Sequence, residues 1–529
     1  MKFILVFILA ILSLPVFAFQ SVVILPFSNQ SHEQQLYWLG EGFAESLSEE
    51  MFLKDVHILQ RPERKAGYEE LRIPYTGDLS RATMLKLGKK LNADYLVFGS
   101  YDLKDKQLSV EARVIQISSS KLSGPIRASG LLDHLYDVQK TMRDGLKQYF
   151  VSQKIFPAGQ LSFGNQSVPL HAYEQYIKGL LETTDSERIK FFQRAIDTVP
   201  GYTQALYRMG VALQRMQRYQ ESNEVFQRTS FSASMQSKVD FLIGLNLYDI
   251  KDYEGAYQKW LLLSKTSPSA EVYNNIGIAL MRKNDFQSAP WYLNQAVELA
   301  PKNEHYHFNL AASYLQEKND VNAAYHFRET IEYLPSDYQA FYFLARLLER
   351  QKNSASNHVQ QLFLETLPTE QKGKFPEQFS SYVQLLRPAL AFLTKEEKQY
   401  TELAREQRLK QWASYVDTYQ RNAKRYLEEE SPEKATFEIR KGISLAPFDW
   451  YLHYLWGLAY EQFQNRSSSV LEFQFSIWCL DNVESHLKLA DIYREADQYK
   501  EAKLQIQQTL ALDPKNKKAL DLWNKIWNK

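Results

Sequence analysis

From about residue 170 onward, apolar residues recur with the spacing of amphipathic helices, and the pattern repeats about every 34 residues. A small residue stands at the same phase of successive units: Gly210, Gly244, Gly277, Ala311 and Ala345. In three units a second small residue follows twelve positions later, and a proline then closes the unit. The pattern predicts paired helices, in which each pair buries its apolar face by stacking on the next pair.

This phase resembles that of the tetratricopeptide repeat, a helix–turn–helix unit. The small residues would lie where the two helices of a unit cross, because a larger side chain there would force the helices apart. The positions to which we assign this structural role are Gly210, Gly244, Ala256, Gly277, Ala289, Ala311, Ala323, Gly457, Ala490 and Ala502.

We expect the repeats in two blocks. The first block covers residues 170–350, and the second covers residues 416–529 and ends in a capping helix. Between them, residues 351–415 lose the phase, since they combine loop-like stretches with a charged helix that has few apolar positions. We interpret this stretch as an irregular helical insertion.

Residues 20–150 show a different pattern, in which short apolar runs and one alternating segment are separated by amphipathic helices. Residues 22–25 form a continuous apolar run typical of a buried strand, and residues 108–114 alternate as a half-exposed strand does. Residues 151–169, which contain prolines and glycines without a clear period, are expected to be a linker. The predicted fold class is therefore α+β multidomain, with a small N-terminal α/β domain followed by an all-α superhelical solenoid of repeats.

The first domain also resembles a known family. Residues 24–27, Gly42, Arg61 and residues 91–101 are similar to the amino-terminal domain of TolB and to related FlgO-like and CsgG-like envelope proteins. In that family the domain is an interaction module and not a catalyst. The resemblance implies a protein-binding or assembly role at the periplasmic side of a Gram-negative envelope.

The first 18 residues combine one lysine, a long apolar run and a small-residue site at Ala18, which is typical of a secretory signal peptide. The alternative is an uncleaved membrane anchor; after cleavage we expect no integral membrane segment. Cys479 is the only cysteine in the sequence, so an intramolecular disulfide and a lipid-modified cysteine at the cleavage junction are excluded. Export without disulfides favours the periplasm of a Gram-negative bacterium. The net charge of +1 does not favour nucleic acid as a partner.

In proteins with similar repeats, the first helix of each unit lines a groove that binds partners. Five of the eight fifth positions of these helices are aromatic in this chain, and aromatic side chains are the usual anchors of protein interfaces. The candidate partner-binding residues are Tyr207, Phe241, Tyr248, Phe308, Tyr342, Arg346, Tyr451, Tyr454 and Arg494. The alternative is that some of them pack against the next unit. No clamp for a terminal carboxylate is visible, so we expect recognition to rest on apolar and aromatic contacts.

Motifs of catalysis are missing from the sequence: it has no phosphate-binding loop, no nucleophile elbow and no His-Glu-x-x-His pattern. We therefore expect no enzymatic activity, no catalytic residue, no cofactor and no metal site. The leading hypothesis is a non-enzymatic periplasmic scaffold that binds partner peptides or proteins in an aromatic-lined groove, in cell-envelope assembly or transport. The alternative is a glycan- or small-ligand-binding envelope protein that uses its N-terminal domain, with the repeats serving oligomerisation. The sequence leaves the partner and the oligomeric state open.

Overall fold

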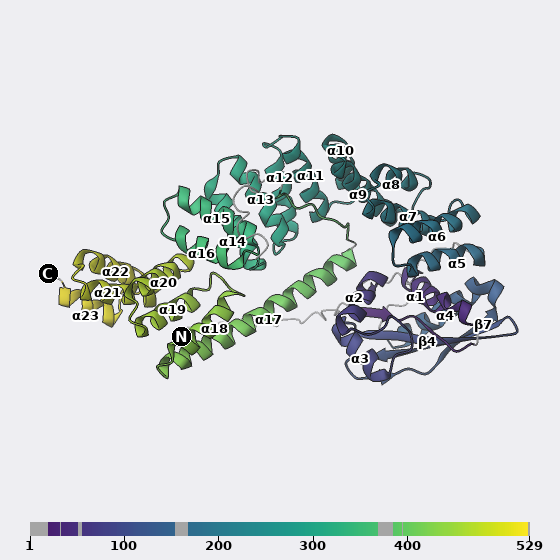
Figure 1. Ribbon diagram of the computed structural model, residues 1–529, viewed down its shortest axis with the longest axis horizontal. Coiled ribbons are helices and arrows are strands. Elements are labelled where there is room, and N and C mark those ends of the chain that lie inside the picture. The colour runs from purple at the N-terminus through teal and green to yellow at the C-terminus, as the bar shows by residue number, and fades with distance from the viewer. Residues whose placement is uncertain are drawn as a thin grey trace, which may run out of the picture. The chain divides into compact units, whose positions relative to one another are not determined.

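The computed structural model (Figure 1) describes residues 20–31, 33–50, 56–153, 168–368, 385–393 and 395–526. The expected signal peptide, residues 1–18, and most of the expected linker lie outside these ranges. No helix among the described residues combines the length and the apolarity needed to cross a bilayer.

The chain divides into two compact units. Unit 1 comprises Met1–Val239 with Leu393–Thr401, and unit 2 comprises Asp240–Phe392 with Glu402–Lys529. Unit 1 contains the strand-bearing domain and the first repeats, whereas unit 2 contains the remaining repeats.

The N-terminal domain is built on a seven-stranded mixed sheet. Its strands are β1 (Gln20–Ile24), β2 (Ser28–Asn29), β3 (Val56–Leu59), β4 (Tyr95–Lys104), β5 (Gln107–Gln116), β6 (Lys121–Leu122) and β7 (Ile126–Leu131). Strand β1 lies between β3 and β4 and is parallel to both. Strands β4 and β5 form an antiparallel hairpin, and β7 pairs with β5 in the antiparallel sense.

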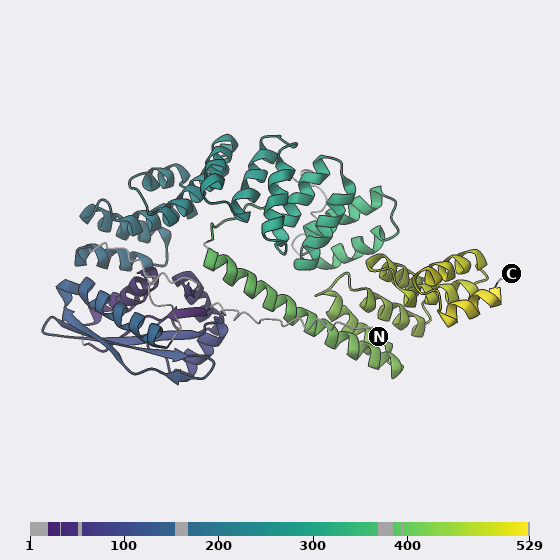
Figure 2. The same cartoon turned by 180° about the vertical axis from the view of Figure 1, so that it is seen from behind.

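Helices cover both faces of this sheet. They are α1 (Trp38–Glu50), α2 (Arg61–Leu71), α3 (Arg81–Lys90) and α4 (Leu135–Ser152). On one face, Val23 of β1 and Leu96 of β4 share a core with Met84 of α3. Tyr101 of β4, an odd number of residues after Leu96, lies on the opposite face and contacts Phe43 of α1, with ring centroids 6.4 Å apart. The domain therefore has three layers, as an α/β arrangement requires (Figure 2).

The N-terminal domain packs directly on the first repeat helix, α5 (Leu170–Leu181). The hydroxyl of Tyr173 in α5 donates a hydrogen bond to the backbone oxygen of Gly42 in α1, and Gln139 of α4 donates to that hydroxyl at 3.0 Å. Arg208 of α7 (Thr203–Arg215) forms a 2.7 Å ion pair with the buried Glu45 of α1. The domain and the first repeats therefore form one packed body, in agreement with the extent of unit 1.

Nine pairs of consecutive helices, and a final helix α23 (Lys517–Ile526), make up the described repeats. The pairs are α5 with α6 (Asp185–Thr198), α7 with α8 (Tyr219–Phe226), α9 (Ala233–Asp249) with α10 (Tyr253–Thr266), α11 (Ala270–Arg282) with α12 (Ala289–Leu299), α13 (Glu304–Gln316) with α14 (Asp320–Tyr333), α15 (Tyr338–Arg350) with α16 (Ser356–Thr366), α17 (Lys395–Glu428) with α18 (Pro432–Ile443), α19 (Trp450–Gln462) with α20 (Arg466–Cys479), and α21 (Val483–Glu495) with α22 (Tyr499–Leu512).

The small positions lie where the two helices of a pair approach most closely. A Cβ atom added to Gly244 would lie 2.3 Å from the Trp260 ring nitrogen, and one added to Gly277 would lie 2.5 Å from Leu293. Gly210 faces Phe226 in the same way, and Gly457 faces Phe473. The alanines of the set, Ala256, Ala289, Ala311, Ala323, Ala490 and Ala502, are fully buried.

The turn between the two helices of a pair has the same left-handed residue in eight of the nine described pairs, the exception being α5–α6. Seven residues after the small position, a non-glycine residue adopts a positive φ in eight pairs: Gln217, Lys251, Asn284, Lys318, Lys352, Glu430, Gln464 and Asp497. Glu430 belongs to this set, so the pair α17–α18 turns as the other repeats do. The left-handed residue ends the first helix and sets the direction of the second.

The limits of the insertion differ from the sequence pattern. Helix α16 packs against α15, so the unit that begins at Tyr338 has a second helix, although its apolar phase fades after residue 349. The boundary expected between residues 415 and 416 falls inside α17, a single helix of 34 residues. What lies between the two blocks is therefore mainly residues 367–394, of which the structure describes 367–368 and 385–393.

Candidate protein-binding face

The first helices of unit 2 carry a row of three buried amides. Asn274 and Asn275 lie on α11 and Asn309 lies on α13, and all three side chains are fully buried. Burying an amide without hydrogen-bond partners costs about 1–3 kcal/mol in proteins, so these side chains need partners. We call this set the asparagine row.

An extended stretch of the same chain, residues 385–392, supplies the partners; we call it the resident segment. The backbone N–H of Arg387 donates to Asn309 Oδ1 at 2.9 Å, and the backbone oxygen of Arg387 accepts from Asn309 Nδ2 at 2.9 Å. Asn275 makes the same pair of bonds with the backbone of Ala389, at 2.8 and 3.0 Å. Each amide thus binds the backbone as a neighbouring β-strand would. Residues 387 and 389 are two positions apart, so in an extended chain both present their backbone groups to the same side.

The row is also connected within itself. Asn309 Nδ2 donates to Asn274 Oδ1 at 2.8 Å, and Asn274 Nδ2 donates to Asn275 Oδ1 at 3.1 Å. Asn274 Nδ2 also lies 3.2 Å from the backbone oxygen of Arg387. Because each amide is held by the next, the row is pre-organised for an extended backbone.

The side chain of Arg387 is bound more specifically than its backbone. Its guanidinium donates to Asp337 Oδ1 at 2.9 Å and to Gln339 Oε1 at 2.8 Å. The guanidinium carbon also lies 3.5 Å from the centroid of the Phe308 ring. Asp337 is itself fixed, because its carboxylate caps α15 by accepting from the N–H of Ala340. This combination of a carboxylate, an amide and an aromatic face is selective for arginine.

Apolar side chains of the resident segment complete the contact. Leu386 is buried in a core with Ile276 and Leu310 of the first helices. The Phe392 ring packs on Phe241 of α9, with centroids 5.9 Å apart. Leu390 points away, with 76% of its surface exposed.

The charge of the face is negative at one edge. Three acidic side chains, Glu271, Glu304 and Asp337, are nearly buried at the amino ends of α11, α13 and α15. Basic side chains reach this edge, since Arg405 of α17 lies 3.7 Å from Glu304 and Arg387 pairs with Asp337. A partner of this edge should therefore be basic.

Two of the aromatic residues predicted from the sequence lie on this face. Phe241 and Phe308 are fully buried, the first beneath Phe392 and the second beneath Arg387. Tyr342 is half-buried and packs against Phe363 of its own repeat.

The other predicted residues lie apart from the resident segment. Tyr248 accepts a hydrogen bond from Arg282 at 2.9 Å and Arg346 is exposed beside Glu349, whereas Tyr207 packs on Phe226 in unit 1. In the second block, Tyr451 and Tyr454 stack with centroids 5.9 Å apart, and Arg494 pairs with Asp491 at 3.4 Å. The structure thus places Phe241 and Phe308 beneath the resident segment, and it does not gather the full set of nine at one site.

Sequence reasoning missed the residues that bind the backbone. It expected apolar and aromatic recognition, whereas the resident segment is held by Asn275, Asn309, Asp337 and Gln339 as well as by aromatic rings. A signal was present, because an Asn-Asn doublet interrupts the apolar helix 270–282. Polar residues on an otherwise apolar helix face indicate a bound polar partner.

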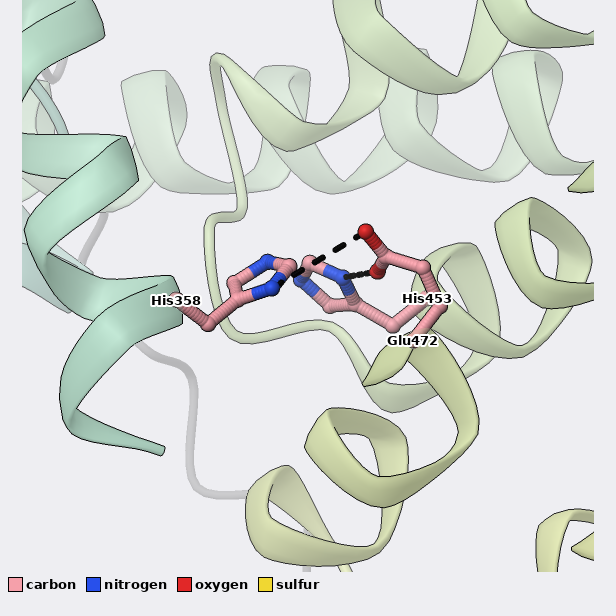
Figure 3. A group of neighbouring side chains, drawn as sticks. All are labelled: His358, His453 and Glu472. Carbon is pink, nitrogen blue, oxygen red and sulfur yellow. Dashed lines mark hydrogen bonds and ion pairs between the residues drawn. The ribbon is translucent and has the colours of Figure 1, made fainter. Parts of the chain in front are cut away.

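A second group of polar side chains is buried between repeats, where His358 of α16, His453 of α19 and Glu472 of α20 converge (Figure 3). Nδ1 of His453 lies 2.8 Å from Glu472 Oε2, and Nδ1 of His358 lies 3.9 Å from Glu472 Oε1. All three ligand atoms lie within 4.8 Å of one another. Burial lowers the pKa of His358 to about 3 and raises the pKa of Glu472.

Comparison with protein families identifies both parts of the chain. A family model of the FlgO protein matches residues 12–124. Two tetratricopeptide-repeat models match residues 274–333 and 483–516, and the first of these ranges contains the asparagine row. A comparison with curated proteins finds no match.

Solved structures that resemble the chain are repeat proteins. YrrB, described as a tetratricopeptide-repeat protein with an unusual peptide-binding site, is 16% identical with a TM-score of 0.30, over 34% of this chain and 93% of YrrB. A MamA fragment from Desulfovibrio magneticus RS-1 is 21% identical with a TM-score of 0.28, over 30% of this chain and 92% of the fragment. A repeat protein from Cytophaga hutchinsonii is 15% identical with a TM-score of 0.24, over 60% and 98% of the two chains. These likenesses concern the fold alone. The family matches and the helix pairs described above show that the chain contains tetratricopeptide repeats that follow an amino-terminal FlgO domain.

Proposed function

We propose that this protein is a non-enzymatic scaffold that binds an extended segment of a partner protein across α11, α13 and α15. Tetratricopeptide repeats support a role in protein–protein interaction. The observation that carries the proposal is the resident segment, because a peptide backbone already lies on this face and is held by Asn275 and Asn309. A face that holds one extended backbone has the groups needed to hold another.

The contacts of the resident segment describe the partner. Asn309 and Asn275 bind only backbone atoms of residues 387 and 389. These bonds therefore place no requirement on the side chains at the two positions, provided that the partner chain is extended. Selectivity comes from the Asp337 and Phe308 site for an arginine, and from the buried position of Leu386 next to it. The partner segment is therefore basic and extended, with a leucine directly before an arginine.

Such a partner competes with the resident segment. Both require the same amides of the asparagine row, so the face binds one of them at a time. The apparent affinity for a partner is lowered by the fraction of molecules in which the resident segment occupies the face. Weakening the resident segment should therefore raise the affinity for peptides added in solution.

The proposed location is the periplasm of a Gram-negative bacterium, in cell-envelope assembly or transport. The signal-like first 18 residues and the FlgO domain support it. Cell fractionation followed by N-terminal sequencing tests it. The expected result is a periplasmic chain that begins after Ala18, and a cytoplasmic chain that retains Met1 would contradict the proposal.

The binding function is tested with a labelled peptide of residues 384–393 and a chain that carries Arg387→Glu and Phe392→Ser. These substitutions place a carboxylate against Asp337 and remove a ring from Phe241, so the resident segment leaves the face. Fluorescence anisotropy should show saturable binding of the peptide to this variant and binding at least tenfold weaker to the wild-type chain.

Two controls locate the peptide. A peptide with Leu390→Glu should bind as well as the natural one, because Leu390 is exposed in the resident segment. A chain that also carries Val321→Ala, on the exposed surface of α14, should bind as before. If the folded double variant shows no saturable binding, or if the Leu390→Glu peptide binds no better than an Arg387→Glu peptide, the proposed face is wrong.

A further inference from the structure

The buried cluster of His358, His453 and Glu472 contains an unusual pairing of two acceptors. Nε2 of His453 lies 2.9 Å from the backbone oxygen of Pro447, and a carbonyl oxygen only accepts, so Nε2 carries the hydrogen. In the neutral ring Nδ1 then has no hydrogen, and it faces the Glu472 carboxylate at 2.8 Å. A cation must lie between these two atoms, either a shared proton or a metal ion.

Two equivalent pairs in other repeats do not have this requirement. In these two pairs the same positions, nineteen residues apart, hold Asp240 with Lys259, which are oppositely charged, and His307 with His326. A third pair, His486 with Gln505, is linked between the His486 Nδ1 and the Gln505 amide, which offers a donor as well as an acceptor. In the histidine pair, Nε2 of His307 donates to the Pro301 oxygen, and Nδ1 of His326 can donate to Nδ1 of His307. The pair of His453 and Glu472 is therefore the repeat's usual link between helices, altered so that two lone pairs meet.

A third ligand completes the cluster. His358 extends from α16 toward the Glu472 carboxylate, and the 3.9 Å between Nδ1 and Oε1 exceeds a hydrogen bond (Figure 3). Ligand atoms of a tetrahedral zinc ion, each about 2.0–2.2 Å from the metal, lie about 3.4 Å apart. The 2.8 Å contact of His453 is to one oxygen of Glu472 and the 3.9 Å contact of His358 is to the other, so the side chains would need shifts of about half an ångström to share an ion.

The environment of the cluster has the features of a metal site. The Pro447 oxygen accepts a hydrogen bond from Nε2 and so orients the His453 ring, as acceptors behind metal-bound imidazoles do. Phe475 covers both rings, with centroids 3.9 Å from His358 and 4.7 Å from His453. A cavity of about 80 Å³ opens beside His358 and is lined by Asn357 and Gln361. It gives an ion a path to the cluster and space for a water as fourth ligand.

We propose that His358, His453 and Glu472 bind one divalent zinc ion, which ties α16 of the first block to the α19–α20 pair of the second. Two imidazoles and a carboxylate suit zinc better than magnesium or calcium, which prefer oxygen ligands alone. The ion replaces a shared proton and fixes two repeats that are separated by more than eighty residues of sequence. The inference is independent of peptide binding by the asparagine row.

The test uses the purified full chain, stripped with EDTA and carrying an affinity tag without histidine. Elemental analysis after equilibration with zinc should find one tightly bound ion per chain. Thermal unfolding should show a rise in Tm of about 5 °C at zinc concentrations a hundredfold above Kd. Magnesium and calcium at the same concentrations should leave Tm unchanged.

Two substitutions assign the ion to the cluster. Glu472→Gln keeps the size of the side chain, and its amide can donate to Nδ1 of His453, so the fold is retained while a ligand is lost. His358→Gln removes the ligand from α16. Both variants should bind zinc at least a hundredfold more weakly and lose the Tm shift. Two control substitutions should leave the zinc affinity and the Tm shift unchanged. His171→Gln removes an exposed histidine of unit 1, and His486→Gln removes a packed histidine of α21.

The proposal is overturned in either of two ways. If the wild-type chain binds no more zinc than the folded Glu472→Gln variant does, a proton alone links His453 to Glu472. Stoichiometric zinc in the folded His358→Gln variant, with an unchanged Tm shift, would place the ion elsewhere.

Discussion

The two repeat blocks have the same scaffold but different first-helix faces. In the first block, the sixth positions of α11 and α13 are Asn275 and Asn309, which bind the backbone of the resident segment. The equivalent positions of α19 and α21 are Leu455, which is buried in the core, and Lys488, which pairs with Glu461 at 2.6 Å. Small residues, turns and helix ends are shared by both blocks, so the repeat pattern alone does not distinguish a face that binds a peptide backbone from one that does not.

The largest expected effect comes from the asparagine row. Asn275→Ala with Asn309→Ala, introduced into the Arg387→Glu/Phe392→Ser chain, removes four hydrogen bonds to the peptide backbone. At about 1 kcal/mol for each bond, peptide affinity should fall by at least a hundredfold in an anisotropy titration. The matched change in the second block, Lys488→Ala, should alter it by less than twofold. If the substitutions in the two blocks lower the peptide affinity equally, the first-helix faces of the two blocks do not differ in peptide binding.

Stability should respond alike in both blocks when a small position is enlarged. Gly244→Ala places a Cβ atom 2.3 Å from Trp260, and Gly457→Ala places one 2.5 Å from Phe473. Each should lower the free energy of unfolding by about 1–3 kcal/mol through overpacking, as measured by urea denaturation. An unchanged midpoint for either variant would show that the helices of that pair separate freely.

Acid should weaken the first block through its buried histidines. Burial lowers the pKa of His326 to about 4, and it also lowers the pKa of His307. The unfolded chain takes up these protons near pH 6.5 and the folded chain does not. The stability is therefore complete above about pH 6.5 and is lost as the pH falls toward 4, by at most about 1.4 kcal/mol per pH unit for each histidine.

This pH dependence is measured by urea denaturation between pH 7.5 and pH 5. His326→Gln should make the slope shallower over that range, whereas His134→Gln, which removes an exposed histidine, should not. A slope that is the same in the wild type and in His326→Gln would exclude His326 as its source.

The smallest effect is expected at the turns. Lys318 in the first block and Gln464 in the second both adopt a positive φ, near 59° and 58°. Glycine adopts this conformation without strain but has more freedom in the unfolded chain, so Lys318→Gly and Gln464→Gly should each stabilise by less than about 1 kcal/mol. Destabilisation by either substitution would mean that the side chain itself holds the turn.

The repeat scaffold could be predicted from the sequence because its causes are local and periodic. A small residue such as Gly277 recurs where helices cross, and a proline such as Pro301 follows most of the second helices by a few residues. The N-terminal domain was predictable for the same reason where strands are continuously apolar, as at residues 22–25. Helix α2 was not, because its buried residues include Arg64 and Gly67 and give no apolar stripe. Buried Arg64 is satisfied by the backbone oxygen of Ile24, a partner 40 residues away in sequence.

The binding face was predictable only in part, because its groups act through contacts that are distant in sequence. The fifth positions pointed to Phe241 and Phe308, which do lie under the resident segment. Asn309 lies 78 residues from Arg387, and no local pattern connects them. The histidine–glutamate cluster is equally distant, since His358 and Glu472 belong to different blocks. Periodicity describes which residues stack on the next repeat, and it carries no information about which segment returns to the face.

The central claim is that the asparagine row binds an extended backbone, and amide hydrogen exchange of residues 385–392 tests it most directly. In the wild-type chain the N–H groups of Arg387 and Ala389 donate to Asn309 and Asn275, so they should exchange far more slowly than in a free peptide. Asn275→Ala with Asn309→Ala should return both to the fast rate while the repeat helices remain protected. Equally fast exchange in the wild type and in this variant would contradict the account.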